Sequence, residues 1–131
     1  MKSHLTMLGL MILSLGCSDS SMPTQTQLDS SINGKTIKYP INYTFSLELD
    51  LNASAGYQWD HNISDTTIVH LDSTKTRPKY IPIVPGGETV KTFYFRTMKT
   101  GICTLNLIEH QRWLPDVLPI HSIQFIVFVY H

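Results

Sequence analysis

The sequence predicts an all-β protein, an immunoglobulin-like β-sandwich of about seven strands that follows an N-terminal lipoprotein-type signal peptide. Three observations indicate this fold. Apolar residues recur at every second position in several short segments. Turn signals containing glycine separate these segments. Outside the leader, no segment has the period of an amphipathic helix. The Cys…Trp…Cys spacing of antibody domains is absent, so the likeness to immunoglobulins is architectural.

Residues 1–16 are interpreted as a signal peptide. A weakly basic start precedes an apolar run over 5–15, which is too short to span a bilayer as a helix. The run ends in Gly16-Cys17, which resembles a bacterial lipoprotein signal, whose cleavage leaves Cys17 as the lipid-bearing first residue. The alternative is ordinary signal cleavage, with Cys17 incidental. We expect an exported protein of the cell envelope (periplasm or outer surface) that meets the membrane only through its lipid.

Residues 17–31 are predicted to form a flexible polar spacer, and residues 32–131 the folded domain. The spacer is rich in Ser, Thr, Asp and Gln and shows no apolar period. Cys103 is then the one cysteine inside the domain, on the apolar face of its segment, and we interpret it as a buried thiol. Without a disulfide framework, the stability of the domain must come from packing.

The first half of the domain is predicted to contain four strands, at residues 36–40, 43–51, 55–61 and 67–71. Pro40 ends the first and indicates an edge strand or a break, because proline lacks an amide hydrogen. The second alternates apolar and polar residues throughout. The third places Tyr57 and Trp59 on one face. The fourth is short and rich in β-branched residues.

The second half is predicted to contain three strands, at residues 89–97, 102–109 and 120–130. The first carries Phe93 and Phe95 on one face and Tyr94 on the other. The second alternates apolar and polar residues. The third is apolar on both faces near its end, which is typical of a central strand.

The composition excludes several classes of function. The net charge is zero and no basic stripe is present, which argues against nucleic acid as a partner. The six histidines are scattered, and none has the spacing of a zinc pair. No nucleophile–base pair stands out, and Gly86-Gly87 lacks the rest of a phosphate loop. We therefore expect neither an enzyme nor a bound cofactor or metal.

Three loops have unusual content, at residues 52–56, 82–88 and 110–116. The first consists of small residues and ends in Gly56, which suits a loop that must approach another surface closely. The third contains Arg112 and Trp113, and these residue types are enriched at binding hot spots. A Trp in a proline-bounded loop is hard to bury in a small core. The alternative is a Trp that lies across the end of the sandwich as a lid.

In this order, the three loops resemble the chagasin-like inhibitors of papain-family cysteine peptidases. The likeness covers about residues 33–130. In that family, an Asn-Pro-Thr-Thr-Gly loop precedes an aromatic residue, a spacer and a Trp. A glycine-rich loop then precedes a Phe-x-Phe strand, and an Arg-Pro-Trp or Arg-Pro-Phe loop follows. The corresponding residues are Asn52, Ala53, Ser54, Ala55 and Gly56 before Tyr57-Gln58-Trp59, then Pro85, Gly86 and Gly87 before Phe93-Tyr94-Phe95, then Arg112 and Trp113.

The resemblance implies a monomeric, reversible inhibitor whose three loops meet at one end of the sandwich and wedge into a peptidase cleft. The first loop would enter over the catalytic cysteine, the glycine-rich loop would pack on one side, and Arg112 with Trp113 would grip the other. The loops lack two of the family's prolines, which bears on potency more than on fold. The alternative is a non-inhibitory envelope module that binds sugar or protein, with Trp59 and Trp113 as its platform.

Overall fold

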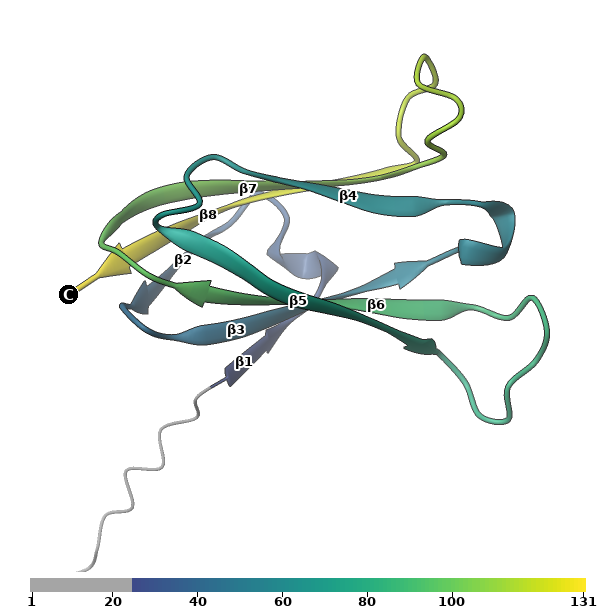
Figure 1. Cartoon of the computed structure of the whole chain (residues 1–131), viewed down its shortest axis with the longest axis horizontal. Coiled ribbons are helices and arrows are strands. Elements are labelled where there is room, and N and C mark those ends of the chain that lie inside the picture. Colours follow the sequence, from purple (N-terminus) through teal and green to yellow (C-terminus); the bar gives the residue numbers. More distant parts are fainter. Residues whose placement is uncertain (1–24) are drawn as a thin grey trace, which may run out of the picture.

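The computed structural model describes residues 25–131, which form two four-stranded sheets (Figure 1). The strands are β1 (Gln25–Leu28), β2 (Thr36–Pro40), β3 (Thr44–Leu51), β4 (Gln58–Ile63), β5 (Val69–Pro78), β6 (Thr89–Thr97), β7 (Gly101–His110) and β8 (His121–Tyr130). Two 3₁₀ turns, η1 (Ser30–Ile32) and η2 (Ala53–Ala55), join them. One sheet has the order β1-β3-β6-β5 and the other β2-β8-β7-β4. The prediction of an all-β fold is confirmed.

The core lies between the sheets and follows from the period-two alternation. Phe45, Phe93 and Phe95 point inward from one sheet, and the rings of Phe45 and Phe95 lie 5.1 Å apart. Leu105 and Phe125 fill the space from the other sheet. Burying such side chains contributes roughly 1.5–3 kcal/mol each, relative to leaving them exposed. Cys103 is also fully buried and free, as predicted.

The places of the first and last predicted strands in their sheet are confirmed. β2 lies at the edge, where Pro40 costs no hydrogen bond on the open side. β8 lies between β2 and β7, pairing in parallel with the former and antiparallel with the latter. Its inward-facing residues Phe125, Val127 and Val129 are buried, whereas Phe128 and Tyr130 on the outer face stay exposed.

The structure differs from the expected boundaries in three places. Gln25–Leu28, expected within the spacer, is a strand that pairs in parallel with β3. The strand expected at 67–71 extends over Val69–Pro78, because it pairs along β6 past a bulge between Leu71 and Ser73. Ala55, expected at the start of a strand, belongs to a 3₁₀ turn. Both additional strand segments are mostly polar, so alternation could not reveal them.

The predicted signal peptide, Cys17 and most of the spacer lie outside the described residues. Within residues 25–131, no helix is long and apolar enough to cross a membrane.

Candidate functional site

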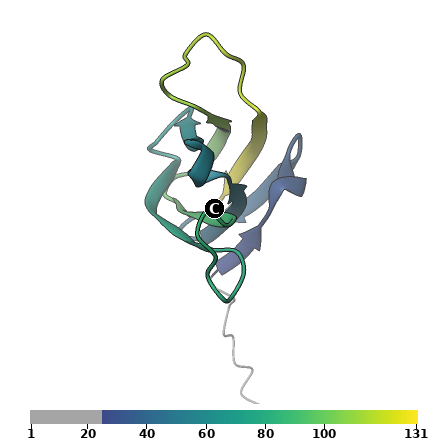
Figure 2. The same cartoon turned by 90° about the vertical axis from the view of Figure 1, so that its right-hand side faces the viewer.

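The three loops predicted to act together lie at the same end of the sandwich. Loop 1 (residues 52–56), followed by Tyr57, joins β3 to β4, loop 2 (79–88) joins β5 to β6, and loop 3 (111–120) joins β7 to β8. All three connections leave their sheets on the same side, at the right in Figure 1. Figure 2 looks onto this end and shows loop 1 between the other two. The fold therefore presents one composite surface made of three segments.

Loop 1 is a short, tight turn. The amide of Gly56 donates to the carbonyl of Ala53 at 2.9 Å, and Gly56 has a φ of +81°. Residues with a β-carbon are strained in this left-handed region, which glycine enters freely. Asn52, Ala53, Ser54 and Ala55 are all exposed. The result is a narrow projection with no large side chain.

Trp113 of loop 3 lies directly on Gly56. A β-carbon added to Gly56 would stand only 2.0 Å from Cη2 of the indole, far inside van der Waals contact. The indole nevertheless keeps 61% of its surface exposed. The ring therefore covers the base of loop 1 and still presents a wide apolar face. Gln111 adds a hydrogen bond from Nε2 to the carbonyl of Ala55 at 2.8 Å.

Arg112 is tied to its own chain. Its guanidinium group donates to the carboxylate of Asp60 on β4, and the same carboxylate contacts Nε2 of His110. The hydrogen bond from Arg112 lowers the pKa of Asp60 to about 2, against the opposing effect of partial burial. The positive charge expected to grip a partner is therefore already paired. Arg112 fixes the start of loop 3 to β4, and Trp113, the next residue, is positioned with it.

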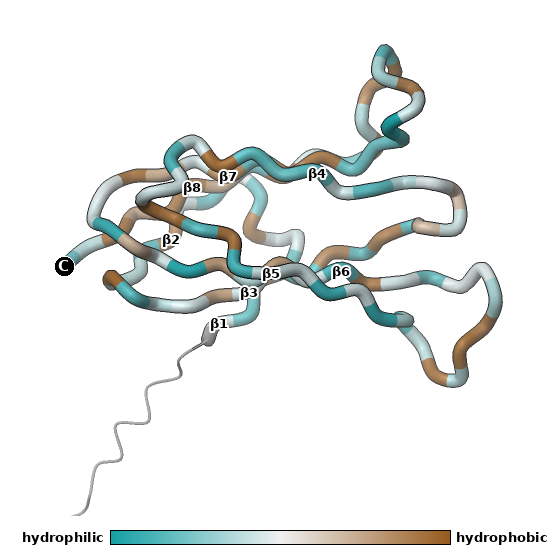
Figure 3. Tube along the Cα trace, viewed as in Figure 1, coloured by the Kyte–Doolittle hydropathy of each residue, from teal (hydrophilic) through white to brown (hydrophobic). Residues whose placement is uncertain are grey.

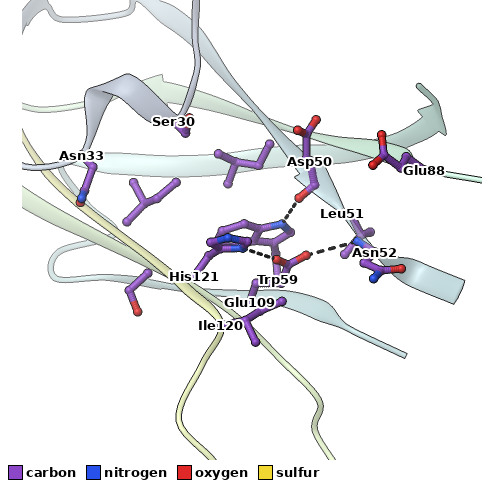
Figure 4. Close-up of a pocket in the computed structure, with 13 residues that line it drawn as sticks. Ser30, Asn33, Asp50, Leu51, Asn52, Trp59, Glu88, Glu109, Ile120 and His121 are labelled. Carbon is purple, nitrogen blue, oxygen red and sulfur yellow. Dashed lines mark hydrogen bonds and ion pairs between the residues drawn. The ribbon is translucent and has the colours of Figure 1, made fainter. Parts of the chain in front are cut away.

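A buried carboxylate, that of Glu109, supports the first residue of loop 1 (Figure 4). Glu109 is only 2% exposed, and it accepts hydrogen bonds from the amide of Asn52 at 3.3 Å and from Nδ1 of His121 at 2.7 Å. A buried charge is tolerated only when its oxygens are satisfied in this way. Since Glu109 and His121 flank loop 3 on paired strands, they join the bases of loops 1 and 3.

Trp59 fills the wall of a pocket of about 550 Å³ beside this carboxylate. It is 3% exposed, its Nε1 donates to the carbonyl of Asp50 at 2.9 Å, and its ring stacks near that of His121. The hypothesis that Trp59 forms part of an exposed ligand platform is therefore wrong. Its aromatic period in the sequence reflects a place in the core.

Loop 2 is closed by its own contacts. The amide of Lys79 donates to the carbonyl of Glu88 at 2.9 Å, and its ammonium group pairs with the carboxylates of Asp50 and Glu88. The predicted Pro85, Gly86 and Gly87 form an exposed turn that faces loop 1 across a groove of about 330 Å³. The contact from Ser54 Oγ to the carbonyl of Gly86 is long, at 3.4 Å. Loops 1 and 2 are thus neighbours with little mutual bonding.

Apolar side chains crowd loops 2 and 3 and avoid loop 1. Of the thirteen exposed large hydrophobic residues among residues 25–131, nine lie in these two loops. They are Tyr80, Ile81, Ile83 and Val84 in loop 2, and Trp113, Leu114, Val117, Leu118 and Ile120 in loop 3. Figure 3 shows the hydrophobic segments on both projections. Monomeric proteins rarely expose such patches unless they bind a partner.

The sequence matches the Chagasin family peptidase inhibitor I42 over residues 38–127, which is most of the domain. The chain belongs to this family. Membership confirms the resemblance read from the loops, and with it the expectation of an inhibitor rather than an enzyme. The search of curated proteins found no match to this chain.

Solved structures share the fold of this chain. The cysteine protease inhibitor EhICP2 from Entamoeba histolytica is 20% identical, with a TM-score of 0.73 over 81% of this chain and 96% of that one. Amebosin, solved in solution, is 18% identical, with a TM-score of 0.63 over 81% and 98%. PbICP-C, in complex with falcipain-2, is 15% identical, with a TM-score of 0.53 over 79% and 97%. At these identities the likeness establishes the shared fold.

Sequence reasoning missed residues on both sides of the surface. Gln111 and Glu109 form hydrogen bonds to loop 1. In the sequence, Gln111 could have been noticed as a polar residue at the end of a strand, and Glu109 as a carboxylate on an otherwise apolar strand face. Ile81 and Ile83 are strongly exposed in loop 2, whereas in the loop predicted at residues 82–88 only Pro85, Gly86 and Gly87 were assigned a role. Their signal was the apolar stretch at residues 80–84, which Pro82 interrupts and which has no strand pattern.

Proposed function

We propose that this chain is a reversible inhibitor of papain-family cysteine peptidases and that loop 1 enters the catalytic cleft between walls contacted by loops 2 and 3. The observation that carries the proposal is the small-residue projection of loop 1, flanked by two apolar loops at one end of the sandwich. EhICP2, a cysteine protease inhibitor, and PbICP-C, which binds falcipain-2, support this class of target.

The contacts of loop 1 favour tight binding because they fix the loop before a partner arrives. Gln111 holds the carbonyl of Ala55, Glu109 holds the amide of Asn52, and the Trp113 ring covers Gly56. Little ordering is then lost on association. These contacts take over part of the role of the family's proline, which restricts the loop chemically in other members. Trp113 adds a large rigid apolar surface at low entropic cost.

The direct test is titration of papain with purified residues 18–131, with residual hydrolysis of a small peptide substrate as the readout. We expect tight, reversible inhibition that weakens at least about tenfold in Trp113→Ala, a loss of roughly 1.4 kcal/mol. The matched control is Ile102→Ala, an exposed apolar residue on β7 away from the loops. A folded domain without inhibition at micromolar concentration against several papain-family enzymes would overturn the proposal.

We further propose that the protein is exported and anchored by a lipid on Cys17. Support comes from the sequence, where the apolar run at 5–15 ends in Gly16-Cys17 and a polar segment follows. Expression in a bacterium, followed by mass spectrometry of the membrane fraction, tests this assignment. Acylated Cys17 at the N-terminus is expected, and Cys17→Ala should release the protein from membranes. An unmodified chain cleaved at another site would contradict it.

A further inference from the structure

The exposed large hydrophobic residues gather at the two ends of the molecule. Nine lie in loops 2 and 3, and the other four lie at the far end, which we define as the end where β8 finishes and β7 starts. These four are Met98, Ile102, Phe128 and Tyr130. Ile102 and Phe128 are cross-strand partners on β7 and β8, so their side chains share one face of the sheet. Met98 lies just before the turn that leads into β7.

The far end combines apolar, aromatic and basic groups. The ammonium of Lys38 lies over the ring of Phe128, 5.9 Å from its centroid, and Lys99 is exposed in the neighbouring turn. Farther along the same sheet the paired residues Asn62, Asn106 and Gln124 are polar. Aromatic rings next to lysines are the side chains that favour the boundary between water and lipid.

The chain enters the described domain at this same end. β1 runs parallel to β3, and Gln25 pairs with Thr44 at the end of β3 opposite loop 1 (Figure 1). Seven residues, 18–24, separate Cys17 from Gln25. Eight Cα–Cα steps span at most about 29 Å. A lipid on Cys17 therefore keeps the far end within reach of the bilayer.

We propose that the far end, through Met98, Ile102, Phe128 and Tyr130, rests on the lipid surface that holds Cys17. This inference rests on the proposed lipid anchor and is independent of the inhibitory function. With the far end on the bilayer, the three loops at the opposite end of the sandwich point away from the membrane and face peptidases in solution (Figure 1).

The experiment uses the full chain, acylated in a bacterial host and reconstituted into phosphatidylethanolamine–phosphatidylglycerol vesicles. An environment-sensitive fluorophore is attached at Thr100→Cys in the far end and, as the matched position, at Leu118→Cys in loop 3; both sites are exposed. Cys103 is buried, and the parent chain without an added cysteine controls for its labelling. Emission wavelength and quenching by bromine-labelled lipid are the readouts. Mass spectrometry of each preparation verifies the lipid on Cys17.

We expect a blue shift and quenching at position 100 and neither at position 118. Ile102→Ser with Phe128→Ser should abolish the shift at position 100 while the chain stays membrane-bound. An unchanged shift in this double variant would overturn the inference, since the tether alone would then explain it. Unshifted emission at position 100 in the acylated parent would also overturn it. A concentration-dependent shift without vesicles would assign the far end to a second copy of the chain instead.

Discussion

Loops 1 and 2 stand side by side and are held in opposite ways. Loop 1 has short side chains and depends on contacts from β7 and loop 3, through Glu109, Gln111 and Trp113. Loop 2 closes through the backbone bond and ion pair between its ends, Lys79 and Glu88, and Lys79 also pairs with Asp50 on β3. A loop without large side chains cannot stabilise its own conformation and must be supported by distant residues. A loop with its own closing contacts tolerates changes elsewhere in the protein.

The largest expected effect comes from Gly56→Ala. The substitution combines left-handed backbone strain with a clash against Trp113, and should raise the inhibition constant at least about tenfold. Gly34→Ala is the matched control, because its φ is +80° with nothing within 4 Å of an added β-carbon. Denaturant unfolding and papain titration measure both variants.

A double-mutant cycle separates the two causes. In a Trp113→Ala background, the added methyl group at position 56 meets no ring, so Gly56→Ala should cost no more unfolding free energy than Gly34→Ala, about 1–2 kcal/mol. Equal costs of Gly56→Ala in both backgrounds would show that the ring does not support loop 1 in solution.

The next prediction compares the free energy of unfolding that is lost when a buried residue supporting loop 1 is changed with the loss when an exposed residue closing loop 2 is changed. Glu109→Gln weakens the acceptor for Asn52 and His121 in a buried site and should lower the free energy of unfolding by about 1–3 kcal/mol. Glu88→Gln alters an exposed pair and should cost less than about 1 kcal/mol. Chemical denaturation of both variants provides the comparison, and equal losses would remove the distinction.

A smaller effect follows from the pairing of Asp60 with Arg112. The folded-state pKa of Asp60 is lowered to about 2 from an ordinary value of 3.8. A lowered pKa contributes stability that is present above about pH 4 and is lost as the pH falls towards 2. The difference in melting temperature between the parent and Asp60→Asn should therefore shrink from pH 6 to pH 2. A difference independent of pH would assign the effect of the substitution to packing.

The smallest effect is expected for Lys79→Ala. Its ion pairs are solvent-exposed, so the unfolding midpoint should not change measurably. Amide exchange should accelerate locally at the Lys79 N–H that bonds the carbonyl of Glu88, and loop 1 amides should keep their rates. Faster exchange at Asn52 would show that the two loops are coupled after all.

The sequence by itself determined the strands that carry the core. Alternation in residues 43–51 and 102–109 reports burial on one face, and burial is a local property of each strand. The small residues of loop 1, the glycine at position 56 and the exposed Trp113 were equally visible, because residue type alone limits what such positions can do. Family membership follows from these features together.

Tertiary structure alone decided the rest. β1 and the second half of β5 are edge segments held by backbone pairing, and their polar side chains carry no periodic signal. The contact of Trp113 with Gly56, the support of Asn52 by Glu109 and the pairing of Arg112 with Asp60 join residues far apart in the chain. Such contacts depend on how strands align within a sheet. One-dimensional patterns record which face of a strand is buried, but not which distant residue meets it.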